Sequence, residues 1–159
     1  MGKEKLPEGL GDLIAETARR TVIEYEQRQQ ARTADAMLHN ATILMENYKV
    51  LKEYAAAKTP GTPTQWGDAY LESITSSKIR TSIMVATIDT ALAEVQEDCR
   101  TDRQSYKWEA FRAHYIAGKS YEEIADQLNS GKNSPARWCK EVMHRLAVRL
   151  FGVDGLKRW

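Results

Sequence analysis

The sequence predicts an all-α protein in which a helical N-terminal region precedes a C-terminal helix-turn-helix domain. Apolar side chains recur every three or four residues through most of the chain, which is the period of a helix with one buried face. The net charge is −3 over residues 1–100 and +4 over residues 101–159. We therefore divide the chain into a helical interaction region, residues 1–100, and a basic helix-turn-helix domain, residues 101–159.

The composition is that of a globular protein. The 159 residues are 42% hydrophobic and 28% charged, with a formal net charge of +1. Cys99 and Cys139 form no C-x-x-C motif, which predicts a reducing compartment rather than a disulfide framework. The N-terminus lacks an apolar signal-peptide core, and no apolar run approaches the length of a membrane span. We expect a cytoplasmic protein with no membrane partner.

The first predicted helix follows an arm of residues 1–11. Asp12 is its candidate cap, and the helix continues through the polar residues 27–33, whose arginines either face solvent or reach a partner. Its apolar positions are Leu13, Ile14, Ala18, Val22 and Tyr25.

A heptad-like seam runs from residue 37 to residue 55. Its members are spaced by four and three residues in turn: Met37, Ala41, Leu44, Tyr48, Leu51 and Ala55. Such a seam either joins copies of the chain into a homo-oligomer or packs against another helix of the same chain, and its length does not decide between these. The two prolines and one glycine in residues 59–63 then end the helix.

A second long helix is predicted in the N-terminal region, after an ambiguous stretch in which Trp66 is a candidate for packing onto the core. The charged residues 97–105 then predict a hinge before the C-terminal domain. The apolar positions of this helix are Ile79, Ile83, Met84, Ile88, Ala91, Leu92 and Val95.

The C-terminal domain opens with a helix that carries Trp108, Phe111, Tyr115 and Ile116 and ends at Gly118. A short helix follows, because Ser120 and Glu123 have the spacing of a capping box. Its apolar stripe is Tyr121, Ile124, Ala125 and Leu128. After a polar break, a third helix presents one apolar arc formed by Pro135, Trp138, Cys139, Val142, Met143, Leu146 and Leu150.

The start of this third helix has two alternatives. It begins either at Lys132, with a strained first turn, or at Pro135, after a longer turn. We favour Pro135, because proline suits the first helical position and the residue before a proline resists helical angles.

The polar face of the third helix is basic. Five cations oppose one carboxylate between residues 132 and 149, a net charge of +4. A short second helix before a basic third helix is typical of helix-turn-helix proteins that bind DNA, although an ordinary three-helix bundle with a solvated basic face has the same pattern. The predicted DNA-binding residues are Lys119, Ser120, Lys132, Asn133, Ser134, Ala136, Arg137, Lys140, Glu141 and His144.

These residues have different expected roles. Arg137 and Lys140 are expected in the major groove, with Ala136, Glu141 and His144 on the same face. Lys119, Ser120 and Lys132 are placed to meet phosphates at helix starts.

No enzyme, metal site or cofactor site is predicted. The three histidines, His39, His114 and His144, lie on separate predicted helices, and Cys139 and His144 do not converge on one metal. Glu122 and Glu123 stand at a helix start, where carboxylates stabilise the helix dipole. The chain also has no glycine-rich phosphate loop.

Several segments resemble known families. Residues 118–128 resemble the helix-turn-helix of bacterial sigma-factor region 4. The end of the chain, residues 146–156, resembles the close of the ArpU/RinA-type phage transcriptional regulators, as do Asn47-Tyr48-x-x-Leu51-Lys52 and Ile88-Asp89-x-Ala91-Leu92 elsewhere. The chain departs from that family at Gly131 and Pro135, where a Ser or Thr cap and an apolar residue are usual.

The resemblance implies a transcriptional activator of phage or prophage late genes. Such a protein binds double-stranded DNA and acts with host RNA polymerase inside a bacterial cell. An oligomeric phage packaging protein, such as a small terminase subunit, is the alternative, since it also joins a helix-turn-helix to helical hairpins. A third reading is a protein-docking module without DNA affinity.

Overall fold

The computed structural model describes residues 9–57 and 68–152, and these ranges contain helices and no strands. The all-α prediction is therefore confirmed. The helices are α1 (Leu10–Glu46), α2 (Tyr48–Ala56), α3 (Asp68–Thr101), α4 (Ser105–Tyr115), α5 (Tyr121–Gln127) and α6 (Ser134–Phe151).

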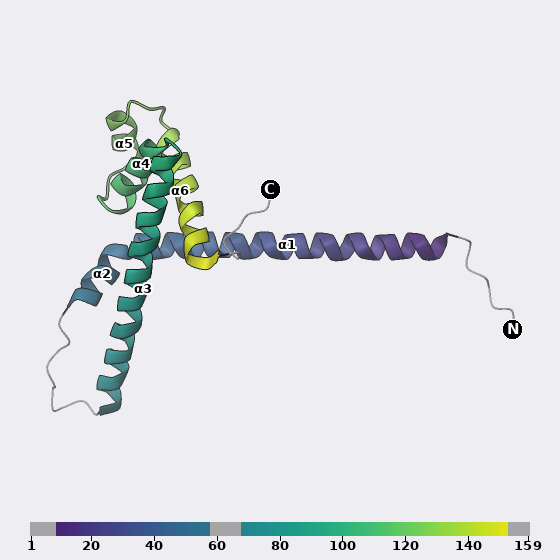
Figure 1. The fold of residues 1–159 in the computed structure, drawn as a ribbon, viewed down its shortest axis with the longest axis horizontal. Helices are drawn as coiled ribbons and strands as arrows, with labels where there is room; N and C mark the ends of the chain where they lie inside the picture. The colour runs from purple at the N-terminus through teal and green to yellow at the C-terminus, as the bar shows by residue number, and fades with distance from the viewer. Residues whose placement is uncertain (1–8, 58–67, 153–159) are drawn as a thin grey trace.

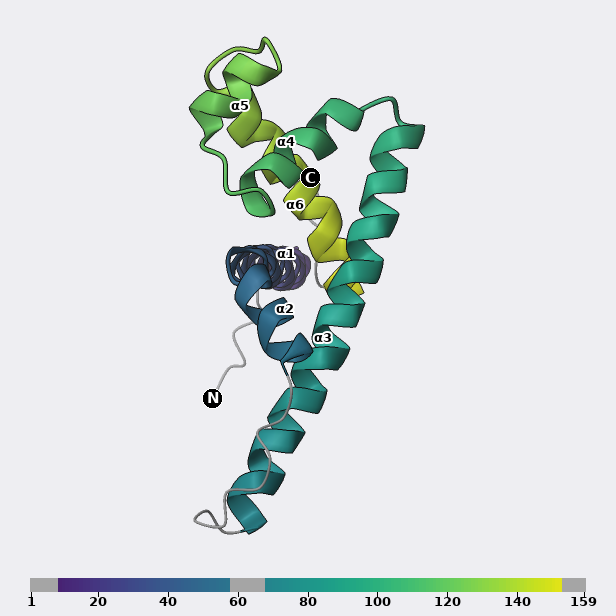
Figure 2. The same ribbon diagram turned by 90° about the vertical axis from the view of Figure 1, so that its left-hand side faces the viewer.

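Two long helices cross and define the shape of the molecule. Helix α3 carries α4, α5 and α6 at its C-terminal end, while α1 extends far beyond the rest of the chain (Figure 1). Turned by a quarter, the same view looks along α1 and shows α2 lying between α1 and α3 (Figure 2). The three C-terminal helices thus form a compact group at one end, and the N-terminal part of α1 projects from it.

One core joins the two predicted regions. Helix α6 packs against α1, α3, α4 and α5. Ala41 of α1, Ile88 of α3, Phe111 of α4 and Leu146 of α6 all belong to a single buried cluster. Because this cluster draws on residues from both sides of position 100, the C-terminal helices are held against α1 and α3 by shared apolar burial.

The heptad-like seam packs against other helices of the same chain. Ala41 and Tyr48 are buried in the core cluster, and Leu44 packs against it. The seam is also interrupted, because α1 ends at Glu46 and α2 begins at Tyr48, with Asn47 between them in a non-helical conformation (φ −103°, ψ 4°). The expectation of one continuous helix from residue 37 to residue 55 was wrong, and the alternative of internal packing describes the seam.

Helix boundaries differ from the prediction in two other places. Helix α1 begins at Leu10 after Gly9, whose φ of 95° suits glycine, so Asp12 lies inside the first turn and is not the cap. The predicted hinge is largely helical, since α3 continues to Thr101 and only residues 102–104 separate it from α4.

The buried stripe of α3 starts later than expected. Ile79, Ile83 and Met84 are exposed, whereas Val85 is buried and continues the stripe that includes Ile88. No described helix packs over these three side chains. Their spacing predicted burial because a sequence period does not show whether another helix covers that face. Ile116 is a similar error, because it lies just beyond α4 and is exposed.

A polar contact fastens α2 to α3. The Tyr48 hydroxyl donates a hydrogen bond to Asp89, and Lys52 Nζ donates to the Tyr48 oxygen at 3.1 Å. Lys52 Nζ also lies 3.8 Å from the Asp89 carboxylate. Burial and the Asp89 contact raise the pKa of Tyr48 above its ordinary value. Residues 47–52 and 88–92, which lie far apart in the sequence, therefore meet in space.

We expect Tyr48→Phe to lower the free energy of unfolding by about 1 kcal/mol, because a partly buried hydrogen bond is lost while the ring remains in the core. Urea denaturation of the two proteins measures this difference. Lys52→Met is the matched control, since its side chain is exposed and its loss should matter less. An equal or larger effect of the control would contradict the proposed fastening.

Other expectations lie outside the described residues. These are the arm before residue 9, the break at residues 59–63, the placement of Trp66, and the segment after Gly152 that resembles the close of the phage regulators.

Candidate nucleic-acid interface

Helix α5 starts with the predicted capping box. Ser120 Oγ accepts a hydrogen bond from the Glu123 backbone N–H at 3.2 Å, and the Glu123 carboxylate accepts one from the Ser120 N–H at 3.1 Å. Gly118 precedes it with a φ of 72°, a conformation that glycine adopts without strain. The Ser120 N–H therefore already donates a hydrogen bond within the protein. It is not free to donate one to a phosphate, as the sequence predicted for this residue.

The turn between α5 and α6 is longer than a helix start at Lys132 would give. It is close in length to the turn expected for a start at Pro135. Helix α6 begins at Ser134, with Asn133 as its N-cap, and Pro135 is the second helical residue. The expected start at Pro135 was therefore wrong by one residue, and the start at Lys132 was wrong by two. Ser134 adopts helical angles even though it precedes a proline, since the buried Pro135 ring is held by the core.

The apolar face of α6 is buried as predicted. Pro135, Cys139, Val142, Met143 and Leu146 are each at most 2% exposed, and Trp138 and Leu150 pack against the same core. Ala147 also lies in this core and was missed, because an alanine adds little to an apolar pattern. Burial raises the pKa of the Cys139 thiol to about 12, which fits a small core residue.

The start of α6 and the turn before it form an exposed region opposite the buried face. Lys132, Asn133, Ala136, Arg137 and Lys140 are exposed, and we call these five residues the exposed tip. Within residues 9–57 and 68–152, its three cations have no carboxylate at ion-pair distance. Three unpaired positive charges therefore lie within about two and a half helical turns.

Three other predicted site residues of α6 are half-buried. Ser134 lies at the helix start beneath the exposed tip. Glu141 forms an ion pair with Lys107 of α4, which removes its charge from the exposed tip. His144 lies one turn beyond Lys140 along α6.

The C-terminal half of α6 is paired with α3. Arg149 donates to Glu94 at 3.1 Å and to Asp98 at 2.6 Å, and the hydrogen bond to Asp98 raises the pKa of Arg149. Arg145 donates to Asp102 at 2.8 Å and to Gln104 at 2.9 Å. Both arginines were counted in the net charge of +4, but their side chains meet carboxylates of α3 and of the turn that follows it.

A signal for this pairing exists in the sequence. Glu94, Asp98 and Asp102 follow one another at intervals of four residues, and so do Arg145 and Arg149. Equal spacing puts each set on one helical face, so the two sets match when their helices lie side by side. Sequence reasoning missed the match because it required knowing that α3 and α6 are neighbours.

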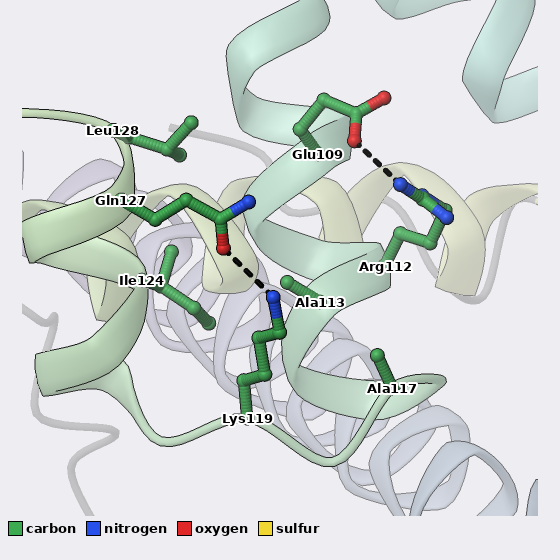
Figure 3. A pocket seen from close by; sticks show the side chains of 8 residues that line it. All are labelled: Glu109, Arg112, Ala113, Ala117, Lys119, Ile124, Gln127 and Leu128. Carbon is green, nitrogen blue, oxygen red and sulfur yellow. Dashed lines mark hydrogen bonds and ion pairs between the residues drawn. The ribbon is translucent and has the colours of Figure 1, made fainter.

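Lys119 lies in the loop before α5 and is held by several contacts. Its Nζ donates to Gln127 at 2.9 Å and its N–H donates to the Ala113 carbonyl at 2.9 Å. Figure 3 shows this side chain spanning a small pocket of about 210 Å³ between α4 and α5, whose other edge carries the Glu109–Arg112 ion pair. The Lys119 ammonium is thus already hydrogen-bonded within the protein.

Aromatic packing fixes α5 against α4. The His114 ring stacks on Tyr121 with centroids 4.1 Å apart, and Tyr115 packs edge-to-face against His114. The His114 Nδ1 lies 2.9 Å from the Lys119 carbonyl oxygen. Burial raises the pKa values of Tyr115 and Tyr121, so both phenols are neutral near pH 7. These contacts hold the short helix α5 against α4.

Two other kinds of feature are absent from the part of the chain that the structure describes. Among the described residues, no group of three or more His, Cys, Asp or Glu side chains is arranged to hold a metal ion. Across those same residues, none of the helices has the length and apolarity needed to span a membrane.

Comparisons with known proteins found no match to this chain among protein-family models, curated proteins or solved structures.

Proposed function

We propose that this protein binds double-stranded DNA through the exposed tip and regulates transcription. The single observation that supports this is the contrast along α6. The turn before α6 and its first two turns carry Lys132, Arg137 and Lys140, which have no carboxylate partner among the described residues, whereas Arg145 and Arg149 further along pair with Glu94, Asp98 and Asp102. Cations left unpaired at one end of an otherwise paired helix suit a polyanionic ligand.

The proposed geometry is that of a helix-turn-helix, with α5 and α6 as its two helices. The start of α6 enters the major groove, where Arg137 can reach a base edge, while Lys132 and Lys140 meet phosphates. Exposed Ala136 keeps this face flat enough for close approach. The buried arc of α6 and the stacked His114–Tyr121 pair hold the reading helix rigidly for that contact.

The regulatory part of the proposal rests on the sequence resemblance. The segment before and within α5 resembles sigma-factor region 4, and the segments around Tyr48 and Asp89 resemble ArpU/RinA-type regulators. On this basis the protein activates phage or prophage late genes together with host RNA polymerase, in the cytoplasm of a bacterial host.

DNA binding should weaken with salt, and the number of free cations sets the slope. About three phosphate contacts give a slope of log affinity against log salt of roughly −3, because each contact releases counterions. Fluorescence anisotropy with labelled duplexes from 50 to 300 mM salt measures it. A slope near zero, or no binding at low salt, would overturn the proposed function. A slope near −5 would show that Arg145 and Arg149 leave α3 to reach DNA.

A further inference from the structure

The pocket between α4 and α5 has a chemistry of its own, separate from the proposed DNA interface. Its volume is about 210 Å³, and its walls come from α4, from the loop before α5 and from α5 with its C-cap. The residues that line it include none of the five residues of the exposed tip. Figure 3 shows the side chains that surround this space.

The base of the pocket is apolar. Ile124 and Leu128 lie on its α5 side, and Ala113 lies on its α4 side. Ile124 is 1% exposed and belongs to the core, whereas Leu128 and Ala113 are half-buried and keep part of their surface open. An alkyl group placed against these side chains would remove that remaining apolar surface from water, which favours binding.

Nitrogen donors lie over this apolar base (Figure 3). Lys119 Nζ donates to Gln127 Oε1 at 2.9 Å, which uses one of the three N–H bonds of the ammonium. Because an ammonium can only donate, the Gln127 amide must present its oxygen to Lys119. The amide NH₂ group is then turned away from Lys119 and has no acceptor among the described residues.

The pocket carries one positive charge that no carboxylate offsets. Arg112 pairs with Glu109 at 2.9 Å, so these two opposite charges balance each other. Lys119 is half-buried, and its ammonium has a neutral amide as its partner and no carboxylate within ion-pair distance among the described residues. Partial burial weakens the screening by water, so an anionic group would be attracted to this ammonium.

The volume limits the size of the ligand. A water molecule occupies about 30 Å³ in the liquid, so the pocket corresponds to about seven waters. Sites that enclose a cofactor or a drug-sized ligand have volumes of roughly 300–1,000 Å³. A nucleotide is therefore too large, whereas an anion with a short branched alkyl chain has the right size and both required groups.

We propose that the pocket between α4 and α5 binds a short branched aliphatic carboxylate as a free small molecule. The carboxylate accepts hydrogen bonds from Lys119 Nζ and from the Gln127 amide, and the alkyl group covers the apolar base. This binding does not require DNA.

Titration of the full chain with 4-methylpentanoate, followed by two-dimensional NMR of the backbone amides, tests this site. We expect saturable shifts at Lys119, Ile124 and Gln127 with a Kd of about 1–10 mM, a weak affinity that suits eight non-hydrogen atoms. Acetate lacks the alkyl group and 4-methylpentanamide lacks the charge, so each should bind at least about tenfold more weakly. Equal binding of either analogue, or shifts confined to the exposed tip, would overturn the proposal.

Two variants assign the donors. Lys119→Met removes the ammonium but keeps the backbone N–H that bonds to the Ala113 carbonyl, and it should weaken binding by about tenfold or more. Gln127→Leu removes the second donor from an exposed position and should weaken binding by about threefold. Lys49→Met, at an exposed position of α2, is the matched control and should bind as the wild type does. Unchanged binding by both pocket variants, or an equal loss in the control, would contradict the assigned site.

Discussion

Replacing Leu146 with alanine is expected to lower the free energy of unfolding by about 2–5 kcal/mol. Leu146 is completely buried where α6 meets the shared core, so the truncation leaves a cavity lined by several helices. One core joins α1, α3 and α6, and we therefore expect the whole described structure to melt in one transition at a lower temperature. Differential scanning calorimetry measures both quantities.

The control for this loss lies on the same helix. Ala136→Ser changes an exposed position of α6 and should shift stability by no more than about 0.5 kcal/mol. Below its melting temperature, the Leu146→Ala protein should still bind DNA, since the exposed tip is unchanged. A Leu146→Ala protein as stable as wild type would contradict the assignment of α6 to the core.

Arg137→Ala is expected to cost about 1–3 kcal/mol of affinity for the cognate site and to relax base preference at one position. The guanidinium is exposed on the second turn of α6 and has no carboxylate partner among the described residues. Its removal should therefore leave the melting temperature nearly unchanged. Anisotropy titrations on cognate and scrambled duplexes, beside thermal melts, separate these two effects.

Arg149→Ala is the matched control, because it removes the same side chain from the same helix. Arg149 pairs with Glu94 and Asp98 on α3 in exposed ion pairs, so its loss should leave DNA affinity unchanged and the melting temperature nearly unchanged. If Arg149→Ala weakens DNA binding more than Arg137→Ala does, the reading surface lies towards α3 and the exposed tip is wrongly assigned.

Local patterns predicted most of the helical framework. The capping box of Ser120 and Glu123 formed as its spacing requires, and the apolar arc of α6 was buried almost residue for residue. Both features depend on interactions within one turn or along one helix face, which a linear sequence displays directly. The all-α class follows from the same local information.

The misassigned features depend on which helices are neighbours. Ile83 has helical spacing but lies on a face of α3 that is left exposed, while Val85 nearby is buried. Arg145 has the charge expected of a DNA contact but meets Asp102 across the α3–α6 packing. The break at Asn47 also follows from packing, since it turns α2 so that Tyr48 reaches Asp89. A sequence period shows which face of a helix is apolar. It does not show which other element packs against that face.

Selection from a randomised DNA duplex library tests the central claim most directly. The wild-type protein and an Arg137→Ala/Lys140→Ala double variant are each carried through the same rounds of binding and sequencing. We predict that the wild type enriches one sequence motif and that the double variant, with an unchanged melting temperature, enriches none. Enrichment of the same motif by both proteins, or of no motif by the wild type, would contradict DNA reading by the exposed tip of α6.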